Sequence, residues 1–183
     1  YTTLFRSGYD TGIDSPANHP LRQAMRRELA ARKLPCLEEL KTFFADHRRK
    51  NAELEYGQYL SFALSTSGPP TFEFRTVMNE VAPDAAALEG LGPLLTRFYR
   101  EADIATLWQK SQPAFDELIA RYHLPVTAAV TEVNGYLRST GSTRGRRFQI
   151  FVDPLGAPNQ SHIRSFAKEY FVVVTASPEP QIN

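Results

Sequence analysis

The sequence predicts an α+β fold in which an N-terminal helical block of about six helices precedes a small C-terminal antiparallel β-meander. Apolar residues recur at helical spacing through most of the chain, whereas β-branched and aromatic runs follow residue 146. The connections between those runs are too short for parallel crossovers, which favours the meander. The helical part is expected over residues 20–139 and the β part over 146–176, within a single domain that covers 8–183.

Three helices are expected in the first third of the chain. Pro20 stands in a first turn, where a helix tolerates proline, and apolar residues follow it at helical spacing, which predicts a helix over 20–33. Pro35 begins a second helix with one apolar and one charged face, and the basic run 48–50 at its end complements the helix dipole. A third helix is expected over 52–64.

The segment SGPP at 67–70 is the strongest break in the chain, because two prolines and a glycine cannot continue a helix. Residues 71–78 then predict a short strand or an extended connector. Two apolar stripes, over 91–99 and 104–122, predict a second helical block. Pro113 is expected to introduce a kink or a fresh helix start. Pro125 is expected to open a further helix in which Val126, Val130, Val133 and Leu137 share a face.

The β part follows Asn134-Gly135. A polar loop is expected over 141–147, a strand over 148–152 and a turn over 153–156. Two further strands are expected over 161–166 and 170–175, the last of which is β-branched and aromatic enough to be largely buried.

Both ends of the sequence carry unusual residues. Residues 1–7, YTTLFRS, match the translation of the end of a sequencing adapter, so we expect a metagenomic fragment whose own protein begins near Gly8; the alternative is an ordinary apolar strand. Ser177-Pro178-Glu179-Pro180 resembles a helix entry, so either a frayed tail or a helix cut at its first turn is expected there. Loss of a covering helix would leave residues 172–174 partly uncovered.

Composition excludes several classes of function. Among the 183 residues, 42% are apolar and 22% charged, which predicts a packed core, and no apolar run is long enough to span a bilayer. A net charge of +1 gives no electrostatic support for binding nucleic acid or an anionic membrane. Cys36 cannot form a disulfide within the chain, and its place near a helix start favours a small buried packing residue over a nucleophile.

No catalytic, cofactor-binding or metal-ligating residue is predicted. The histidines His19, His47, His123 and His162 lack the spacing of a joint metal site, and each is better explained as a surface, capping or structural residue. The loop 141–147 is glycine- and arginine-rich, but it lacks the Gly-Lys-Ser/Thr ending of a nucleotide loop, so a solvated loop is favoured over an anion site. The acid pairs at 38–39 and at 101 and 103 are explained by solvation, and Trp108 is expected in the core.

Three stretches carry a family resemblance: FRSGYDTGIDSPANHPLRQAMRRELA at 5–30, LGPLLTRFYREADI at 91–104 and GRRFQIFVDPLGAPNQSHIRSFAKEYFVVVTASPEPQ at 145–181. They resemble a family of bacterial proteins, some containing tetratricopeptide repeats, whose layout is similar to that of gluzincin-type zinc metallopeptidases. In that layout a helical N-terminal region leads into an antiparallel sheet, and the next helix carries two zinc histidines. The positions that would match the zinc helix lie beyond Asn183, so no catalytic residue is carried over.

The resemblance implies that this chain is the N-terminal, non-catalytic portion of such a peptidase, truncated before its zinc helix. Its partners would then be the C-terminal remainder of the parent and extended peptide, held by main-chain pairing along an edge strand of the sheet. The chain itself is expected to show no hydrolysis and to bind no zinc, whereas the parent would use zinc and a secreted or periplasmic location is expected for it. The alternative is a protein- or peptide-binding scaffold domain of a helical-repeat protein, with no catalysis.

Overall fold

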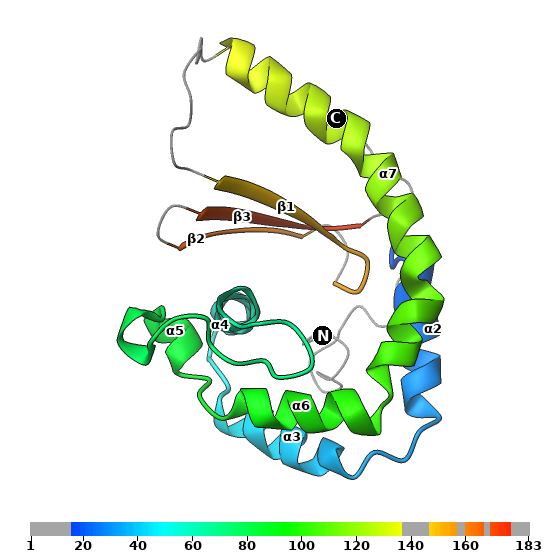
Figure 1. The fold of residues 1–183 in the computed structure, drawn as a ribbon, viewed down its shortest axis with the longest axis vertical. Helices are drawn as coiled ribbons and strands as arrows, with labels where there is room; N and C mark the ends of the chain where they lie inside the picture. The colour runs from blue at the N-terminus through cyan, green and yellow to red at the C-terminus, as the bar shows by residue number, and fades with distance from the viewer. Residues whose placement is uncertain (1–15, 137–146, 157–159, 167–168, 177–183) are drawn as a thin grey trace. The chain divides into compact units, whose positions relative to one another are not determined.

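The computed structural model describes residues 16–136, 147–156, 160–166 and 169–176 (Figure 1). The chain divides into two compact units. Among the described residues, unit one comprises 25–109 and unit two comprises 16–24 and 110–176 with the gaps just given. The two boundaries fall inside helices, so each unit is described by itself below.

The first three helices lie where the sequence predicts them. They are α2 (Pro20–Ala30), α3 (Cys36–Asp46) and α4 (Ala52–Ser65). The start of α4 is capped by Asn51, whose side-chain oxygen accepts hydrogen bonds from the N–H groups of Glu53 at 2.8 Å and Leu54 at 3.3 Å. An asparagine at this position supplies an acceptor to backbone donors that have no partner inside the helix.

The segment after α4 is an extended connector and not a regular strand. Only an isolated antiparallel bridge, between Thr66 and Phe74, forms there among the described residues. The 3₁₀ turn η1 (Met78–Glu80) and the short α5 (Pro83–Ala86) follow it and lead to α6 (Leu91–Glu101). Of the two alternatives for 71–78, the connector is therefore confirmed.

A single helix, α7 (Ile104–Tyr136), contains both Pro113 and Pro125. The prediction that Pro125 opens a new helix, and the alternative of a fresh start at Pro113, are therefore wrong; Figure 1 draws α7 as one unbroken ribbon. Each proline removes one backbone donor, but water can satisfy the carbonyl that loses it when the helix surface is exposed. Pro113 is exposed and Pro125 is half-buried.

Unit one is held together by apolar packing between helices. Helices α3 and α6 pack against each other, as do α4 and α5. The most deeply buried apolar side chains, with 0–2% of their surface exposed, are Cys36, Leu40, Tyr59, Phe62, Ala85, Leu88, Leu91, Phe98 and Ala102. Burying a side chain of leucine or phenylalanine size stabilises a fold by about 1.5–3 kcal/mol, so this cluster is the main source of stability in unit one.

Buried polar groups join α4 to the end of α3. The Glu55 carboxylate, 1% exposed, accepts a hydrogen bond from the Arg49 N–H at 3.0 Å. Arg49 Nε donates to Gln58 Oε1 at 2.8 Å, and Gln58 Nε2 donates to the His47 carbonyl at 3.1 Å. These bonds satisfy polar groups that would be costly to bury alone, and they fix the turn between the two helices.

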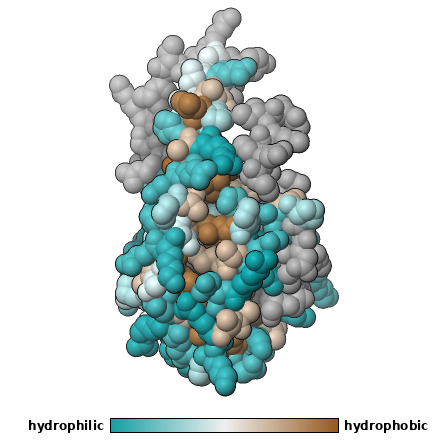
Figure 2. Space-filling view, turned by 90° about the vertical axis from the view of Figure 1, so that its right-hand side faces the viewer, coloured by the Kyte–Doolittle hydropathy of each residue, from teal (hydrophilic) through white to brown (hydrophobic). Residues whose placement is uncertain are grey.

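Part of the apolar pattern of α7 is exposed to solvent. Ile104, Leu107 and Leu118 are buried, with 2–5% exposed, but Trp108 is 40% and Ile119 57% exposed. The expectation that Trp108 lies in the core is therefore wrong, because the buried stripe is narrower than the apolar stripe. Figure 2, which faces the side where α7 lies in Figure 1, shows separate apolar patches on a mostly hydrophilic surface. None of the helices described combines the length and apolar character that a bilayer span requires.

Unit two contains a three-stranded sheet formed by β1 (Arg147–Asp153), β2 (Ser161–Phe166) and β3 (Glu169–Thr175). The strand order is β1-β3-β2, with β3 parallel to β1 and antiparallel to β2. The α+β class with its N-terminal helical block is thus confirmed, but the antiparallel meander is wrong, since the sheet is mixed. The connection from β1 to β3 is long enough for parallel pairing because β2 itself forms part of it.

The turn after β1 is confirmed, and its geometry requires glycine. The Leu155 N–H donates to Asp153 Oδ1 at 2.8 Å, and the Ala176 N–H donates to the Asp153 carbonyl at 2.9 Å. A Cβ atom on Gly156 would lie 2.5 Å from Thr175 Cγ2, closer than atoms can approach. The turn therefore packs directly against the end of β3, which fixes its position at the end of β1.

Candidate functional site

The sheet of unit two presents different surfaces on its two faces. Side chains alternate between the faces along a strand, so Phe171 and Val173 share one face and Val172 lies on the other. Phe171 and Val173 are buried, with 3% and 6% exposed. Residues 172–174 are expected to be partly exposed. Val172 and Val174 are half-buried, as expected, but Val173 is buried.

A row of β-branched side chains crosses the less buried face. Val172 is paired with Ile150 of β1 and with Ile163 of β2, so the three lie side by side across the sheet. Ile150 is 40% exposed and Ile163 is 65% exposed. We call Ile150, Val172 and Ile163 the apolar row. Contact of such a row with water is unfavourable, which makes this face a candidate binding surface.

The strand order shows which strands form the edges of the sheet. Because β3 lies between the other two strands, β1 and β2 are the edges within the described residues (Figure 1). Of the three strands that the sequence offers for pairing with a peptide, the last is therefore excluded.

The hydrogen-bond register shows which backbone groups of β2 face away from the sheet. The Thr175 N–H donates to the Gln160 carbonyl at 2.9 Å, so the pair Gln160–Thr175 is of the hydrogen-bonded kind. Hydrogen-bonded and non-hydrogen-bonded pairs alternate in an antiparallel ladder. The N–H and C=O groups of Ser161, Ile163 and Ser165 therefore point away from β3, and the side chains of all three residues are exposed.

One outward carbonyl on β2 is bonded to a neighbouring side chain. Arg164 Nη1 donates to the Ile163 carbonyl at 2.9 Å. Charged residues on edge strands are a common protection against unwanted strand pairing, because they occupy backbone groups that would otherwise bind another chain. A peptide that paired with β2 at Ile163 would displace this guanidinium.

The histidines have the local roles that the sequence predicts for them. His19 Nδ1 accepts the Leu21 N–H at 3.2 Å, at the start of α2, and burial, assisted by the charge of Arg121, lowers the His19 pKa. His47 Nδ1 donates to the Phe43 carbonyl at 2.7 Å, at the end of α3, and its ring stacks on that of Phe43 at 3.9 Å. His123 is exposed on α7, and His162 is half-buried on β2.

The acids that the sequence assigns to solvent are partly brought together between α3 and α6. Arg97 of α6 forms a bidentate ion pair with Glu39 of α3, with N–O distances of 2.7 and 2.9 Å, and lies 3.5 Å from Glu101. Glu101 Oε2 also accepts the Cys36 N–H at 2.9 Å. Sequence reasoning missed this cluster because its members are distant in the chain and only helix packing brings them together.

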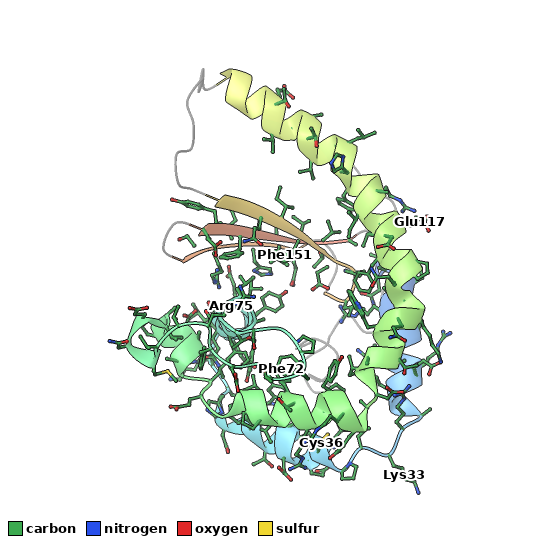
Figure 3. The ribbon with its side chains drawn as sticks, in the orientation of Figure 1. Lys33, Cys36, Phe72, Arg75, Glu117 and Phe151 are labelled. Carbon is green, nitrogen blue, oxygen red and sulfur yellow. The ribbon has the colours of Figure 1, made fainter. Side chains whose placement is uncertain are left out.

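Cys36 lies between α3 and α6, where Figure 3 shows it (0% exposed). Burial raises the pKa of its thiol to about 12, and the hydrogen bond to Glu101 adds to the effect. A thiol in this state is a poor nucleophile, since the thiolate is the reactive form. The prediction of a buried packing residue is confirmed.

No group of three or more histidine, cysteine or carboxylate side chains is placed for joint metal binding in the parts of the chain described. The loop 141–146 and the segment 177–180 lie outside the described residues. Comparison of the chain with family models, with curated proteins and with solved structures gave no significant match. The sheet edge and the apolar row are therefore the site on which a functional argument can be built.

Proposed function

We propose that this chain is the N-terminal, non-catalytic portion of a gluzincin-like zinc metallopeptidase and that its sheet holds extended peptide along β2. The observation that carries the proposal is the outward-facing, exposed backbone of Ser161, Ile163 and Ser165. An extended peptide can add to such an edge as a further strand, with main-chain hydrogen bonds supplying affinity.

The apolar row supports the same role. A peptide paired with β2 would place every second side chain on the face of Ile163, next to Val172 in the adjacent strand. Apolar residues at alternate positions of the peptide would then cover Ile163, which is 65% exposed. The sheet would thus select extended peptides with alternating apolar side chains, and the chemistry on the peptide would belong to the zinc helix of the parent.

Peptide binding tests the role of β2. The probe is a fluorescently labelled hexapeptide of alternating valine and threonine with a lysine at each end, and binding is followed by anisotropy. Ile163→Pro removes an N–H that points away from β3, so the sheet keeps its own ladder and the fold should survive. Loss of one main-chain bond should weaken binding about two- to tenfold.

Ile163→Ala is the matched control, because it shortens the same side chain and keeps the backbone N–H. Weaker binding to Ile163→Pro than to Ile163→Ala supports main-chain pairing, provided that circular dichroism shows both variants folded. Main-chain pairing is contradicted if the labelled peptide binds both variants equally, or if it does not bind the unsubstituted chain.

The DNA sequence that follows this segment in the gene tests the metallopeptidase assignment separately. A helix with paired histidines and a glutamate, encoded directly after this segment, supports the assignment. A run of helical repeats with no such helix contradicts it and favours the scaffold alternative, even if β2 binds peptide.

A further inference from the structure

A groove of about 770 Å³ lies within unit one, between α6 and the connector that follows α4. Its α6 side is formed by Gly92, Pro93, Thr96, Arg97 and Arg100, which share one face of the helix because they recur at spacings of three and four. The connector and α4 supply aromatic walls. The residues that the argument uses are Phe62, Phe72 and Phe74 on the walls, Glu89 and Arg100 at the ends, and Arg97 between them. The volume is within the range of small-ligand pockets.

The wall at Phe72 is held in a strained backbone conformation. Its φ of 53° lies in the left-handed region, which is unfavourable for a bulky side chain and costs about 1–3 kcal/mol. Figure 3 shows Phe72 on the segment that runs beside α6. Thr96 Oγ1 donates to the Thr71 carbonyl at 3.1 Å, and a Cβ atom on Gly92 would lie only 2.7 Å from the Phe72 carbonyl oxygen. The connector is therefore fastened closely to α6.

Four charged residues line the groove: Glu73, Glu89, Arg97 and Arg100. Arg97, in the middle, is already neutralised by its bidentate pair with Glu39 and by Glu101. Within the part of the chain that the structure describes, the other three form no ion pair: Arg100 at one end, Glu89 at the other and Glu73 on the connector. Glu89 lies two residues before Leu91, the first residue of α6, and the helical stretch from Leu91 to Arg100 is about 14 Å long.

We propose that this groove binds a short free peptide of about four or five residues, with its terminal carboxylate at Arg100 and its terminal ammonium near Glu89. An extended chain rises about 3.3 Å per residue, so such a peptide spans the distance between the two charges. A terminal carboxylate fits because the cation without an ion pair lies at the end of the groove and not in its middle. The aromatic walls would receive an apolar side chain. This site is in unit one and is independent of peptide pairing with β2.

The probes are the pentapeptide Leu-Ala-Phe-Leu-Ala with free termini, its C-terminal amide and its N-acetyl form, titrated into the complete chain and followed by calorimetry and by backbone amide shifts. The free peptide should bind, with shifts in 71–78 and 89–100. Amidation should weaken binding about two- to fivefold, as expected for an exposed ion pair, and acetylation should do so to a similar or smaller extent.

Two variants separate the carboxylate contact from a general charge effect. Arg100→Gln should weaken binding of the free peptide about two- to fivefold and leave binding of the amide unchanged. Arg27→Gln, an exposed arginine at the end of α2, is the control and should change neither. Equal affinity for the free and amidated peptides, equal effects of the two variants, or no binding at millimolar peptide contradicts the proposal. Normal binding by Ile163→Pro would show that the site is distinct from β2.

Discussion

The helical core of unit one encloses apolar side chains completely, whereas the sheet of unit two leaves part of its apolar side chains in contact with water. Leu88 and Leu91 in unit one are 0% exposed, but Ile150 and Ile163 on the sheet are 40% and 65% exposed. Residues of the same chemical type thus serve different purposes in the two regions. In unit one they stabilise the fold, whereas on the sheet Ile150 and Ile163 remain in contact with water.

Polar groups differ between the two regions in the same way. In unit one, Glu55 and Gln58 are buried, and each is hydrogen-bonded to the turn between α3 and α4. On the sheet, Ser161 and Ser165 are exposed with their backbone groups directed away from β3. A region that satisfies its own hydrogen bonds is suited to support, and one that leaves them open is suited to binding.

The largest expected effect comes from shortening a side chain in each region. Leu88→Ala should lower the free energy of unfolding by about 2–5 kcal/mol, because it removes three carbons from a closed core. Ile163→Ala should change it by no more than about 0.5 kcal/mol, because water already reaches that side chain. Urea denaturation of the two variants measures both values. Similar losses in the two variants would contradict the distinction between core and surface.

A smaller effect is expected from adding a methyl group to a glycine in each unit. In Gly92→Ala the new Cβ would lie 2.7 Å from the Phe72 carbonyl, so α6 and the connector must separate, at a cost of about 1–3 kcal/mol. Gly135→Ala in α7 meets no atom within 4 Å, so it should be neutral or slightly stabilising. Thermal unfolding compares them. A tolerated Gly92→Ala would mean that the groove wall is less firmly fixed than its contacts indicate.

The difference between the units also explains which features the sequence could predict. Helical periodicity placed α2 and α3 correctly, because each buries one stripe of its own residues. It also placed α4, although α4 buries the polar Glu55, Gln58 and Ser61 beside Tyr59 and Phe62. The parallel pairing of β1 and β3 was not predictable from connection length, because β2 lies within that connection. Local rules also favoured breaks at Pro113 and Pro125, but a helix that can continue on both sides tolerates the loss of one hydrogen bond.

The sites were harder to predict than the fold. Sequence alone named three strands that could pair with a peptide, and the strand order and register were needed to show that β1 and β2 are edges and which backbone groups of β2 point outward. The groove depends on Phe72 in a left-handed conformation and on Gly92, and neither residue stands in a recognisable motif. Similarly, Glu39, Arg97 and Glu101 meet only because α3 packs against α6.

The smallest expected effect is a change in the acid sensitivity of unit one. Hydrogen bonds from the Cys36 thiol and from its backbone N–H, together with the nearby charge of Arg97, lower the pKa of the Glu101 carboxyl. A carboxyl whose pKa is lowered by folding adds stability above its unfolded pKa and loses it as the pH falls through the folded value. The native chain should therefore lose more stability between about pH 5 and pH 3 than Glu101→Gln, which cannot titrate.

Glu117→Gln is the matched control in unit two, since Glu117, labelled in Figure 3, forms an exposed pair with Arg121 at 3.1 Å. Exposed pairs of this kind contribute about 0–1 kcal/mol, so its removal should leave the acid dependence close to that of the native chain. The measurement is urea denaturation at successive pH values. If Glu101→Gln follows the native curve as closely as Glu117→Gln does, the Glu101 carboxylate does not couple α3 to α6, and apolar packing and the Arg97–Glu39 ion pair must hold those helices together.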